Sequence, residues 1–357
     1  MPSFKIQGPK TFDAVTVKLD CNVLEAAKQR LNWILDRYDS VVVAFSGGKD
    51  SLAVMHLLRQ VQQSRGLPDV VHCIFRDEEL IPMSVINFVD HYRQLPWVKL
   101  KWFAVQLKSS KYLFGKSIDY IQWDKNREHV RPKPEFAITE PSNKVFDQYS
   151  MDAEIASHYK GKVCILTGIR TQESLTRYRA IINKINETFV AATQSKRVDL
   201  GRPIYDWTEN DIFKFFYDYE IQYAAIYNAQ LFAGHPLRVA TPLHSEGAKR
   251  LNLWRAIDPE FYDSVLRVFP EVAVQDIYGE EVKELKGATA DPTSFIELEE
   301  WLYKSFEGEQ LAQALKRYAE VMSFQRNPKV AKSYPFEYVL KQFKSGTIKR
   351  TFMPKTR

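Results

Sequence analysis

Cysteine is scarce in this sequence, and the spacing of the few that occur excludes several kinds of site. The 357 residues include three cysteines, Cys21, Cys73 and Cys164, with no CxxC pair and no histidine cluster at metal-ligand spacing. A disulfide framework, a zinc site and an iron–sulfur cluster with four ligands from this chain are therefore excluded. Cys73 and Cys164 lie in apolar runs, so we expect both to be buried as small hydrophobic residues.

Long hydrophobic runs are also missing. No stretch reaches the roughly 18 apolar residues of a membrane span, and the opening residues MPSFKIQGPK lack the apolar core of a signal peptide. We therefore expect a soluble, cytoplasmic protein with no membrane partner. Hydrophobic residues still make up 45% of the chain, enough for a sizeable core.

Positive charge is concentrated at the C-terminus. The formal net charge is +6, but residues 1–323 sum to −2 and residues 324–357 to +8. A polyanion such as DNA or RNA would therefore contact the basic segment 326–357 or a local pocket. The alternative is a solvated end. Aromatic residues in the segment indicate that part of it packs: Tyr334, Phe336, Tyr338 and Phe343.

Apolar strands alternate with amphipathic helices in the first half of the chain. This order predicts an α/β fold with a doubly wound parallel sheet that binds ligands at the carboxyl ends of its strands. The expected strands are 41–45, 70–75, 100–106 and 163–168, and the expected helices are 23–38, 52–62 and 85–94.

The domain organisation predicted from these patterns has two parts. Residues 1–257 form the α/β domain, interrupted at about 107–160 by an inserted lid region rich in Trp, Pro and charge. Residues 258–357 form a helical C-terminal region that ends in the basic segment.

The most informative motif is SGGKDS, residues 46–51, between an apolar strand and a helix. Gly47 and Gly48 allow a sharp bend that points successive amides into one concavity, and the helix N-terminus favours an anion there. Ser46 and Ser51 can donate hydroxyl hydrogen bonds to phosphate oxygens. The alternative is an ordinary strand-to-helix turn that holds two glycines.

Charged residues of this motif suggest how a phosphate would be bound. Lys49 can neutralise anionic oxygens, whereas Asp50 would repel them unless Mg²⁺ bridges it to the phosphates, which is our expectation. The spacing differs from that of a Walker A loop.

The SGGKDS motif resembles the PP-loop of the adenine nucleotide α-hydrolase superfamily. This superfamily includes ATP pyrophosphatases and phosphoadenylyl-sulfate (PAPS) reductases. Two further stretches resemble the PAPS reductase branch: Gly168-Ile-Arg170-Thr-Gln-Glu173-Ser174-Leu-Thr-Arg177 and Pro203-Ile-Tyr205-Asp206-Trp207-Thr-Glu-Asn-Asp211. The resemblance covers roughly residues 20–260. It implies a fold of the PP-loop (HUP) type in which Gly168, Arg170, Glu173 and Arg177 join the loop around a nucleotide.

A narrower resemblance concerns the predicted insertion. Trp123-Asp124 together with Arg131-Pro132-Lys133-Pro134 is similar to an insertion of the Ibr-type co-regulators, which act with a ParB-like protein. This resemblance implies a ParB-like protein partner.

The residues of the second motif also suit an anion site. Arg170 and Arg177 follow a strand end, where guanidinium groups can clamp phosphate or sulfate oxygens. Glu173 either orients an arginine or binds metal; alternatively, it forms an ordinary i,i+4 surface pair with Arg177. We expect Asp206 and Trp207 to be structural, as a helix cap and a buried ring.

The residues after the second strand, Arg76, Asp77 and Glu78, are weaker candidates for contacts to substrate or ribose. Asp77 or Glu78 either holds Mg²⁺ or a ribose hydroxyl, or lies in a solvated loop. The inserted region is basic. Its cations either close over an anionic substrate or, as we expect for each one, are solvated: Lys108, Lys111, His129, Arg131 and Lys133. His235 and His244 are expected to be structural.

A PAPS reductase needs a nucleophilic cysteine near its C-terminus, and here Cys164 is the last cysteine. We therefore expect cleavage of ATP between the α- and β-phosphates, with Lys49, Asp50 and Arg170 as catalytic residues, rather than sulfate reduction or sulfotransfer. The alternative is a co-regulator that binds ATP or a PAPS-like nucleotide and acts with a ParB-like partner on DNA.

Overall fold

The computed structural model of the chain describes residues 20–113, 116–139, 144–173, 189–234, 237, 241–244, 248, 251–274, 291–325, 332–345, 348 and 352–356. The chain divides into two compact units. Unit 1 consists of Met1–Ser109, Tyr120–Pro242 and Asn252–Val268, and unit 2 of Ser110–Asp119, Leu243–Leu251 and Phe269–Arg357. Each unit is described by itself.

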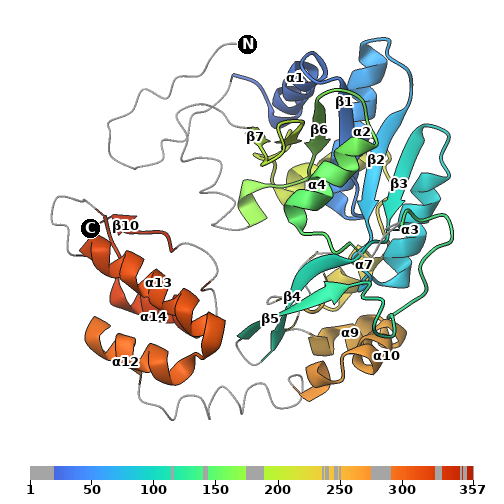
Figure 1. The fold of residues 1–357 in the computed structure, drawn as a ribbon. Helices are drawn as coiled ribbons and strands as arrows, with labels where there is room; N and C mark the ends of the chain where they lie inside the picture. Colours follow the sequence, from blue (N-terminus) through green and yellow to red (C-terminus); the bar gives the residue numbers. More distant parts are fainter. Residues whose placement is uncertain are drawn as a thin grey trace. The chain divides into compact units, whose positions relative to one another are not determined.

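Unit 1 is built on a six-stranded sheet with the strand order β3-β2-β1-β6-β8-β7 (Figure 1). The strands are β1 (Ser40–Ala44), β2 (Val71–Arg76), β3 (Val98–Phe103), β6 (Val163–Leu166), β7 (Val190–Ala192) and β8 (Val198–Gly201). Neighbouring strands are parallel except for β7 and β8, which are antiparallel. The four strands predicted from the sequence are β1, β2, β3 and β6, so the doubly wound parallel sheet is confirmed.

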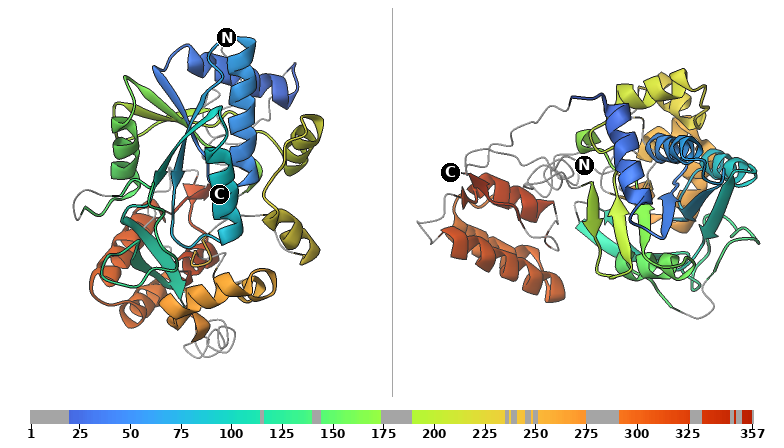
Figure 2. Two further views of the ribbon diagram at one scale, coloured as in Figure 1. Left: turned by 90° about the vertical axis from the view of Figure 1, so that its right-hand side faces the viewer. Right: turned by 90° about the horizontal axis from the view of Figure 1, so that it is seen from above.

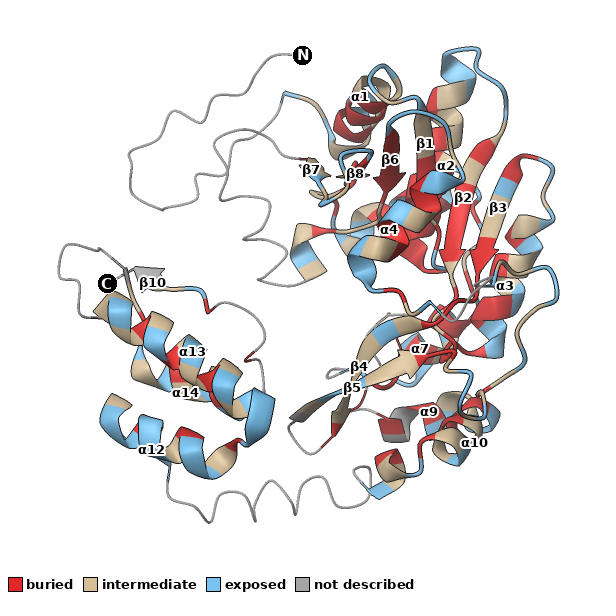
Figure 3. Cartoon of the chain, viewed as in Figure 1, coloured by how far each residue is buried: buried red, intermediate tan, exposed pale blue. Residues whose placement is uncertain are grey.

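Helices cover both faces of this sheet. Val42 of β1 packs toward α4 (Gln148–Ser157), and the alternation of side chains along a strand turns Val43 to the opposite face. On that face, α1 (Val23–Leu35) and α2 (Lys49–Ser64) pack against each other (Figure 2), and α3 (Met83–Arg93) follows β2. Figure 3 shows that buried residues are concentrated on the strands and on the helix faces that meet them.

The predicted insertion at 107–160 is only partly outside the sheet layers. β4 (Leu107–Leu113) and β5 (Lys116–Gln122) form a separate two-stranded hairpin. In contrast, Met151 and Ile155 of α4 are fully buried against the sheet, which differs from the expectation of a lid. The physical reason is that the helical spacing of apolar residues resumes after the Trp- and Pro-rich stretch.

Unit 2 has a small core formed by α12 (Phe295–Ser305), α13 (Gly308–Gln325) and α14 (Phe336–Lys344). β9 (Lys332–Ser333) pairs with β10 (Lys355–Thr356). Tyr334 and Phe343 are buried in this core, as the aromatic residues of the basic segment indicated. Lys344 of the segment forms an ion pair of 2.6 Å with Asp291.

Two further helices precede this core: α9 (Leu251–Ile257) and α10 (Pro259–Val268). The domain boundary predicted at 257/258 lies between them, whereas the last segment of unit 1 ends at Val268; the predicted boundary stays a prediction. In the part of the chain that the structure describes, no helix is long and apolar enough to cross a membrane.

Both cysteines expected in the core are buried. Cys73 and Cys164 are fully buried, and burial raises the pKa of the Cys164 thiol to about 12. Cys21 is half-buried.

Candidate functional site

The SGGKDS motif lies between β1 and α2, with Gly48 as the N-cap residue of the helix. Gly47 has a φ of +75°, and a Cβ at this position would lie 2.8 Å from the side chains of Val85 and Val89 on α3. Only glycine meets both constraints, so the bend of the loop and its contact with α3 depend on Gly47.

The two serines of the motif bond to each other. The Ser46 and Ser51 hydroxyls are 3.1 Å apart, the Ser46 amide donates to Ser51 Oγ at 3.1 Å, and the Ser51 hydroxyl donates to the Gly48 carbonyl at 3.0 Å. These bonds hold the loop closed on the first turn of α2. A ligand that takes hydroxyl donors from this pair would have to reorient them.

Lys49 is the cation at the N-terminus of α2, and its side chain is 5% exposed. Its ammonium group donates to the Leu237 carbonyl at 2.9 Å and lies 3.2 Å from a carboxylate oxygen of Glu209, the first residue of α6 (Glu209–Asp218). It also lies 3.4 Å from Asp50. The buried positive charge is therefore compensated by oxygens of the chain itself.

Tyr227 on α7 (Ile226–Phe232) is a member of the site that the sequence did not reveal. Its hydroxyl accepts a hydrogen bond of 2.9 Å from the Lys49 amide, one of the helix N-terminal donors suited to a phosphate. A Cβ on Gly48 would lie 3.3 Å from this hydroxyl. Burial raises the pKa of Tyr227, so the phenol stays neutral.

The GxRxxE stretch lies beside the loop, as predicted. Gly168 follows β6, and a Cβ there would lie 2.6 Å from the Asp50 backbone, so this close approach of the two segments requires glycine. Arg170 is buried and donates from Nε to Asp50 at 2.7 Å. The structure thus brings Lys49, Asp50 and Arg170 together in one cluster.

Glu173 lies in the short 3-10 helix η1 (Thr171–Glu173), where its carboxylate accepts the Arg170 amide at 3.1 Å. It therefore holds the Arg170 backbone, and its expected role of orienting an arginine or binding metal stays a prediction. Arg177 and its predicted phosphate contact or surface pair lie outside the described residues.

The motif around Asp206 and Trp207 is structural, as expected, but Asp206 has a different role from the one predicted. Trp207 is 1% exposed, as expected, and its indole donates to the Val23 carbonyl at 3.0 Å. Asp206 does not cap a helix; it accepts two hydrogen bonds, of 2.8 and 2.7 Å, from the buried guanidinium of Arg30. Thr208 is the residue that caps α6.

Asp77 differs from both alternatives considered for it. It is buried, and its oxygens accept from the Glu79 amide at 3.0 Å, from Trp102 Nε1 at 2.8 Å and from Arg131. It is neither solvated nor free to coordinate an ion. Glu78 is partly buried, and burial raises the pKa of its carboxyl group.

A second buried acid, Glu79, was not singled out from the sequence. Its φ of +65° is unusual for a residue with a side chain. Its carboxylate accepts two hydrogen bonds, of 2.7 and 2.5 Å, from Arg127 and one of 2.6 Å from the Trp123 amide. Together with Asp77, Glu79 fastens the loop after β2 to residues 123–131.

The remaining charged residues considered from the sequence form separate contacts with nearby residues. Arg76 forms an ion pair of 2.7 Å with the buried Asp152. Lys111 pairs with Glu271 within unit 2, and His129 contacts the Asp124 carbonyl. His244 is exposed, and His235 lies outside the described residues.

The fit of Mg²⁺ to Asp50 follows from these contacts. Among the residues that the structure describes, no group of three or more His, Cys, Asp or Glu side chains could hold a metal ion. Asp50 is a single carboxylate whose two oxygens face Arg170 and Lys49. It does not form a metal site by itself, and Mg²⁺ at Asp50 stays a prediction.

The fold and the loop define the class of protein: a parallel α/β domain with a glycine-bent loop and two buried cations at the carboxyl ends of β1 and β6. Residues 40–265, more than half of the chain, match the family model of the phosphoadenosine phosphosulfate reductase domain. The chain belongs to this family. The family-level resemblance is thereby confirmed, and the Ibr-type subfamily stays a prediction.

The relatives are distant. The protein YbdN of Escherichia coli strain K12, itself uncharacterized, is 30% identical in an alignment of 263 positions that covers 68% of this chain and 64% of YbdN. The chain thus matches somewhat less than two thirds of that relative's length.

Similar solved structures include the FMN adenylyltransferase of Candida glabrata with FMN and the ATP analog AMPCPP (11% identity, TM-score 0.41, covering 63% of this chain and 66% of that one). A PAPS reductase from Candida auris has 11% identity and a TM-score of 0.36, covering 64% of this chain and 98% of that one. The U34-tRNA thiolase NcsA of Methanococcus maripaludis has 15% identity and a TM-score of 0.33, covering 69% and 76%. Similarities this low carry no argument about function.

Proposed function

We propose that this protein binds an adenine nucleotide with its phosphates at Ser46–Ser51 and cleaves ATP between the α- and β-phosphates. The observation that carries the proposal is the pair of buried cations, Lys49 and Arg170, placed beside the N-terminus of α2 and compensated by carboxylates. Phosphate oxygens can take the place of these carboxylates, so that binding exchanges one set of charge-assisted hydrogen bonds for another.

In this reaction a nucleophile attacks the α-phosphorus, and the bond from that phosphorus to the oxygen bridging to the β-phosphate breaks. Pyrophosphate leaves with that bridging oxygen and its electron pair. Lys49 and Arg170 stabilise the charge that develops on the α-phosphate oxygens of the transferred adenylyl group and on the leaving group. With water the product is AMP; with an acceptor it is an adenylylated compound. Mg²⁺, if required, would arrive with the nucleotide.

Reduction of PAPS by the thiol of Cys73 or Cys164 is not favoured. Cys73 and Cys164 are fully buried, and burial raises both thiol pKa values, whereas a nucleophilic cysteine needs an accessible thiolate.

A second candidate is a co-regulator that binds ATP or a PAPS-like nucleotide without turnover and acts with a ParB-like partner on DNA. One observation favours it: the amide and the ammonium group of Lys49 are both engaged within the chain, the amide by the Tyr227 hydroxyl and the ammonium group by Glu209. A site closed in this way is suited to ligand-controlled opening. The basic segment 326–357 would contact DNA or RNA.

Pyrophosphate release separates the two candidates. The purified protein is incubated with ATP or PAPS and Mg²⁺, with and without duplex DNA, and pyrophosphate is measured by a coupled assay. Release from ATP supports the enzyme. Stabilisation by nucleotide without release, with DNA present, favours the co-regulator. A thermal-shift panel of ATP, dATP, PAPS and adenylyl sulfate ranks the ligands through RT ln(1 + [L]/Kd).

Lys49→Ala tests the site itself. Loss of a buried charge-assisted contact should weaken nucleotide binding by about 10- to 100-fold. The matched control is Lys214→Ala, which removes an exposed lysine of α6 that pairs with Asp218. If Lys49→Ala leaves the affinity for every nucleotide in the panel unchanged, the assignment of the loop is wrong.

A further inference from the structure

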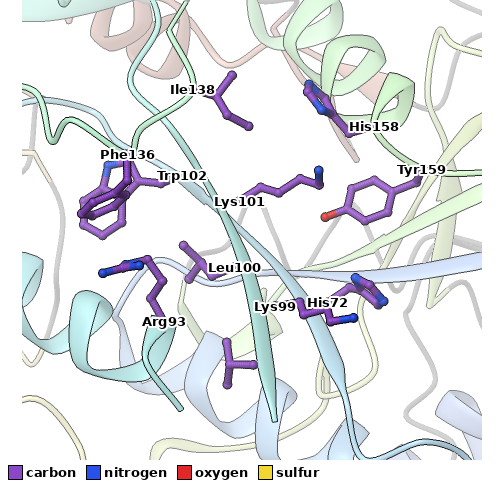
Figure 4. A pocket seen from close by; sticks show the side chains of 11 residues that line it. His72, Arg93, Lys99, Leu100, Lys101, Trp102, Phe136, Ile138, His158 and Tyr159 are labelled. Atoms are coloured by element: carbon purple, nitrogen blue, oxygen red, sulfur yellow. The ribbon is translucent and has the colours of Figure 1, made fainter. Parts of the chain in front are cut away.

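A cavity of about 570 Å³ lies beside β3, which is the edge strand of the central sheet. Figure 4 shows its side chains on both sides of the strand, with Trp102, Phe136 and Arg93 on one side and Tyr159, His72 and His158 on the other. The cavity thus surrounds the free edge of the sheet. It is formed within unit 1 and shares no residue with the phosphate loop.

The backbone of β3 has hydrogen-bonding groups that face this cavity. The Trp97 and Phe103 carbonyls accept from Val71 and Asp77, so the odd-numbered residues of this stretch face β2. On the other side, the Trp102 carbonyl accepts from Ile138 at 2.7 Å. By the alternation of a strand, Leu100 directs its amide and carbonyl to the open edge, and no described residue bonds to either group.

The charge around this edge is positive. Lys99 and Lys101 form no salt bridge with the carboxylates of the described residues, and no Asp or Glu lines the cavity. Arg93 pairs with Asp90 at 2.6 Å and stacks on Phe136. Burial and the nearby charges of Lys99 and Lys101 lower the pKa of His72.

Lysines on an edge strand commonly prevent sheets from pairing with one another. Lys99 and Lys101 would also discriminate between guest strands, because acidic side chains would match them, whereas a neutral or basic strand would not. Aromatic walls on both sides of the strand add apolar contact for its alternate residues.

We propose that the Val98–Lys101 edge of β3 binds an extended acidic segment of a partner protein as an added strand, through the backbone of Leu100 and the side chains of Lys99 and Lys101. The guest strand lies next to the short pairing that Phe103 makes with Ile138 and continues the sheet outward. This interaction is independent of the proposed nucleotide chemistry.

The first experiment uses a fluorescein-labelled ten-residue peptide of alternating Glu and Val as the probe, with the full-length protein and anisotropy as the readout. We expect saturable binding that weakens by about tenfold in Lys99→Glu/Lys101→Glu. The control Lys125→Glu/Lys196→Glu makes the same change of charge at two exposed lysines away from β3 and should bind as the wild type does. Equal loss in both double variants would overturn the proposal in favour of non-specific attraction.

A second experiment asks whether the backbone takes part. Hydrogen exchange of the Leu100 amide should slow by at least about tenfold on saturation with the peptide, because a strand hydrogen bond protects it. Leu100→Pro, which removes this outward donor and leaves the donors toward β2, should abolish binding while the melting temperature shows that the variant is folded.

If the cavity binds another kind of ligand, the same experiments give results that contradict strand addition. Binding of the Glu–Val peptide without protection of the Leu100 amide, or its displacement by single-stranded DNA or inorganic phosphate, would show a simple anion site and refute strand addition. A peptide of alternating Lys and Val that binds as tightly would refute the charge selection.

Discussion

Gly47 shows how one residue can meet two separate constraints. Its φ of +75° costs a residue with a side chain about 1 kcal/mol, and a Cβ would also overlap Val85 and Val89 at 2.8 Å. We expect Gly47→Ala to lower the free energy of unfolding by about 3 kcal/mol, the sum of backbone strain and overpacking. Urea denaturation with an unchanged m-value measures this loss.

Gly66 is the matched control for this measurement. It has a similar φ of +65°, but nothing lies within 4 Å of the position of its Cβ. Gly66→Ala should therefore cost only about 1 kcal/mol. Equal losses in the two variants would mean that the contact between the loop and α3 does not constrain the loop.

A substitution at Tyr227 tests most directly whether the loop is closed by bonds within the chain. Tyr227→Phe removes the acceptor of the Lys49 amide and leaves a buried donor unpaired, which should destabilise the nucleotide-free protein by about 1–2 kcal/mol. A phosphate oxygen would satisfy the same amide. We therefore expect nucleotide to restore most of the lost stability, with an affinity about tenfold tighter than that of the wild type.

Thermal unfolding with and without ATP, together with calorimetric titration, measures both effects. The control Tyr223→Phe alters a neighbouring tyrosine whose hydroxyl contacts Asn228 at 3.3 Å and is not bonded to the loop. Weaker nucleotide binding in Tyr227→Phe would mean that the phenol contributes to the ligand site and does not compete for it.

At the scale of elements, the strongly periodic segments were predictable and the tertiary contacts were not. The apolar runs at β1, β2 and β6 identify strands buried on both faces, and these fix the position of the loop. β8 was missed because its sequence, VDLG, contains an acid and a glycine; Asp199 accepts from the Tyr38 hydroxyl at 2.6 Å. No local pattern reveals such a distant partner.

The same limit applies to the site. Lys49 and Arg170 were found because their motifs are continuous in sequence, whereas Tyr227 and Glu209 reach the loop from separate helices. Glu79 and Arg127, 48 positions apart, form a partly buried ion pair that the local sequence around neither residue indicates. One feature of the sequence did indicate this pair: several acidic residues follow β2, and the stretch 127–133 is basic. Complementary charges of this kind favour pairing.

The contact between α2 and α3 carries a pH-dependent contribution to stability. His56 packs its ring against Trp97 and lies 3.1 Å from the Tyr92 hydroxyl, and burial together with Arg59 lowers its pKa to about 4. Between about pH 6.5 and 4 the unfolded chain binds a proton at this group that the native state does not. Stability is therefore lost as the pH falls through this window.

His56→Gln removes this linkage. Between pH 7 and 4.5 we expect the wild type to lose about 2 kcal/mol more of its unfolding free energy than the variant loses. Urea titrations of both proteins at the two pH values give the difference, which cancels contributions from other groups. His91→Gln, an exposed histidine on α3, is the control; an identical pH dependence of wild type and His56→Gln would contradict the assignment.

At the scale of the whole molecule, the distribution of charge separates two kinds of interaction. Residues 1–323 carry a net charge of −2, and the cations Lys49 and Arg170 in unit 1 are compensated by carboxylates. Residues 324–357 carry +8. A small anionic ligand at the loop depends on local geometry, whereas any contact with a nucleic acid depends on the summed charge of this segment and on salt.

The salt dependence of DNA binding therefore tests the role of the basic segment. If it contacts duplex DNA, the logarithm of the binding constant should fall linearly with the logarithm of the salt concentration, with a slope of about −0.9 for each phosphate neutralised. Lys349→Ala/Arg350→Ala should make the slope shallower by about 2 and weaken binding equally for unrelated sequences.

Lys125→Ala/Lys196→Ala, with the same loss of charge in unit 1, should leave the slope unchanged. Anisotropy titrations of a labelled duplex between 50 and 200 mM salt (about the range over which such contacts are resolved) measure it. The segment has no such role if both double variants change the slope alike, because the binding would then follow from net charge and not from the position of the cations.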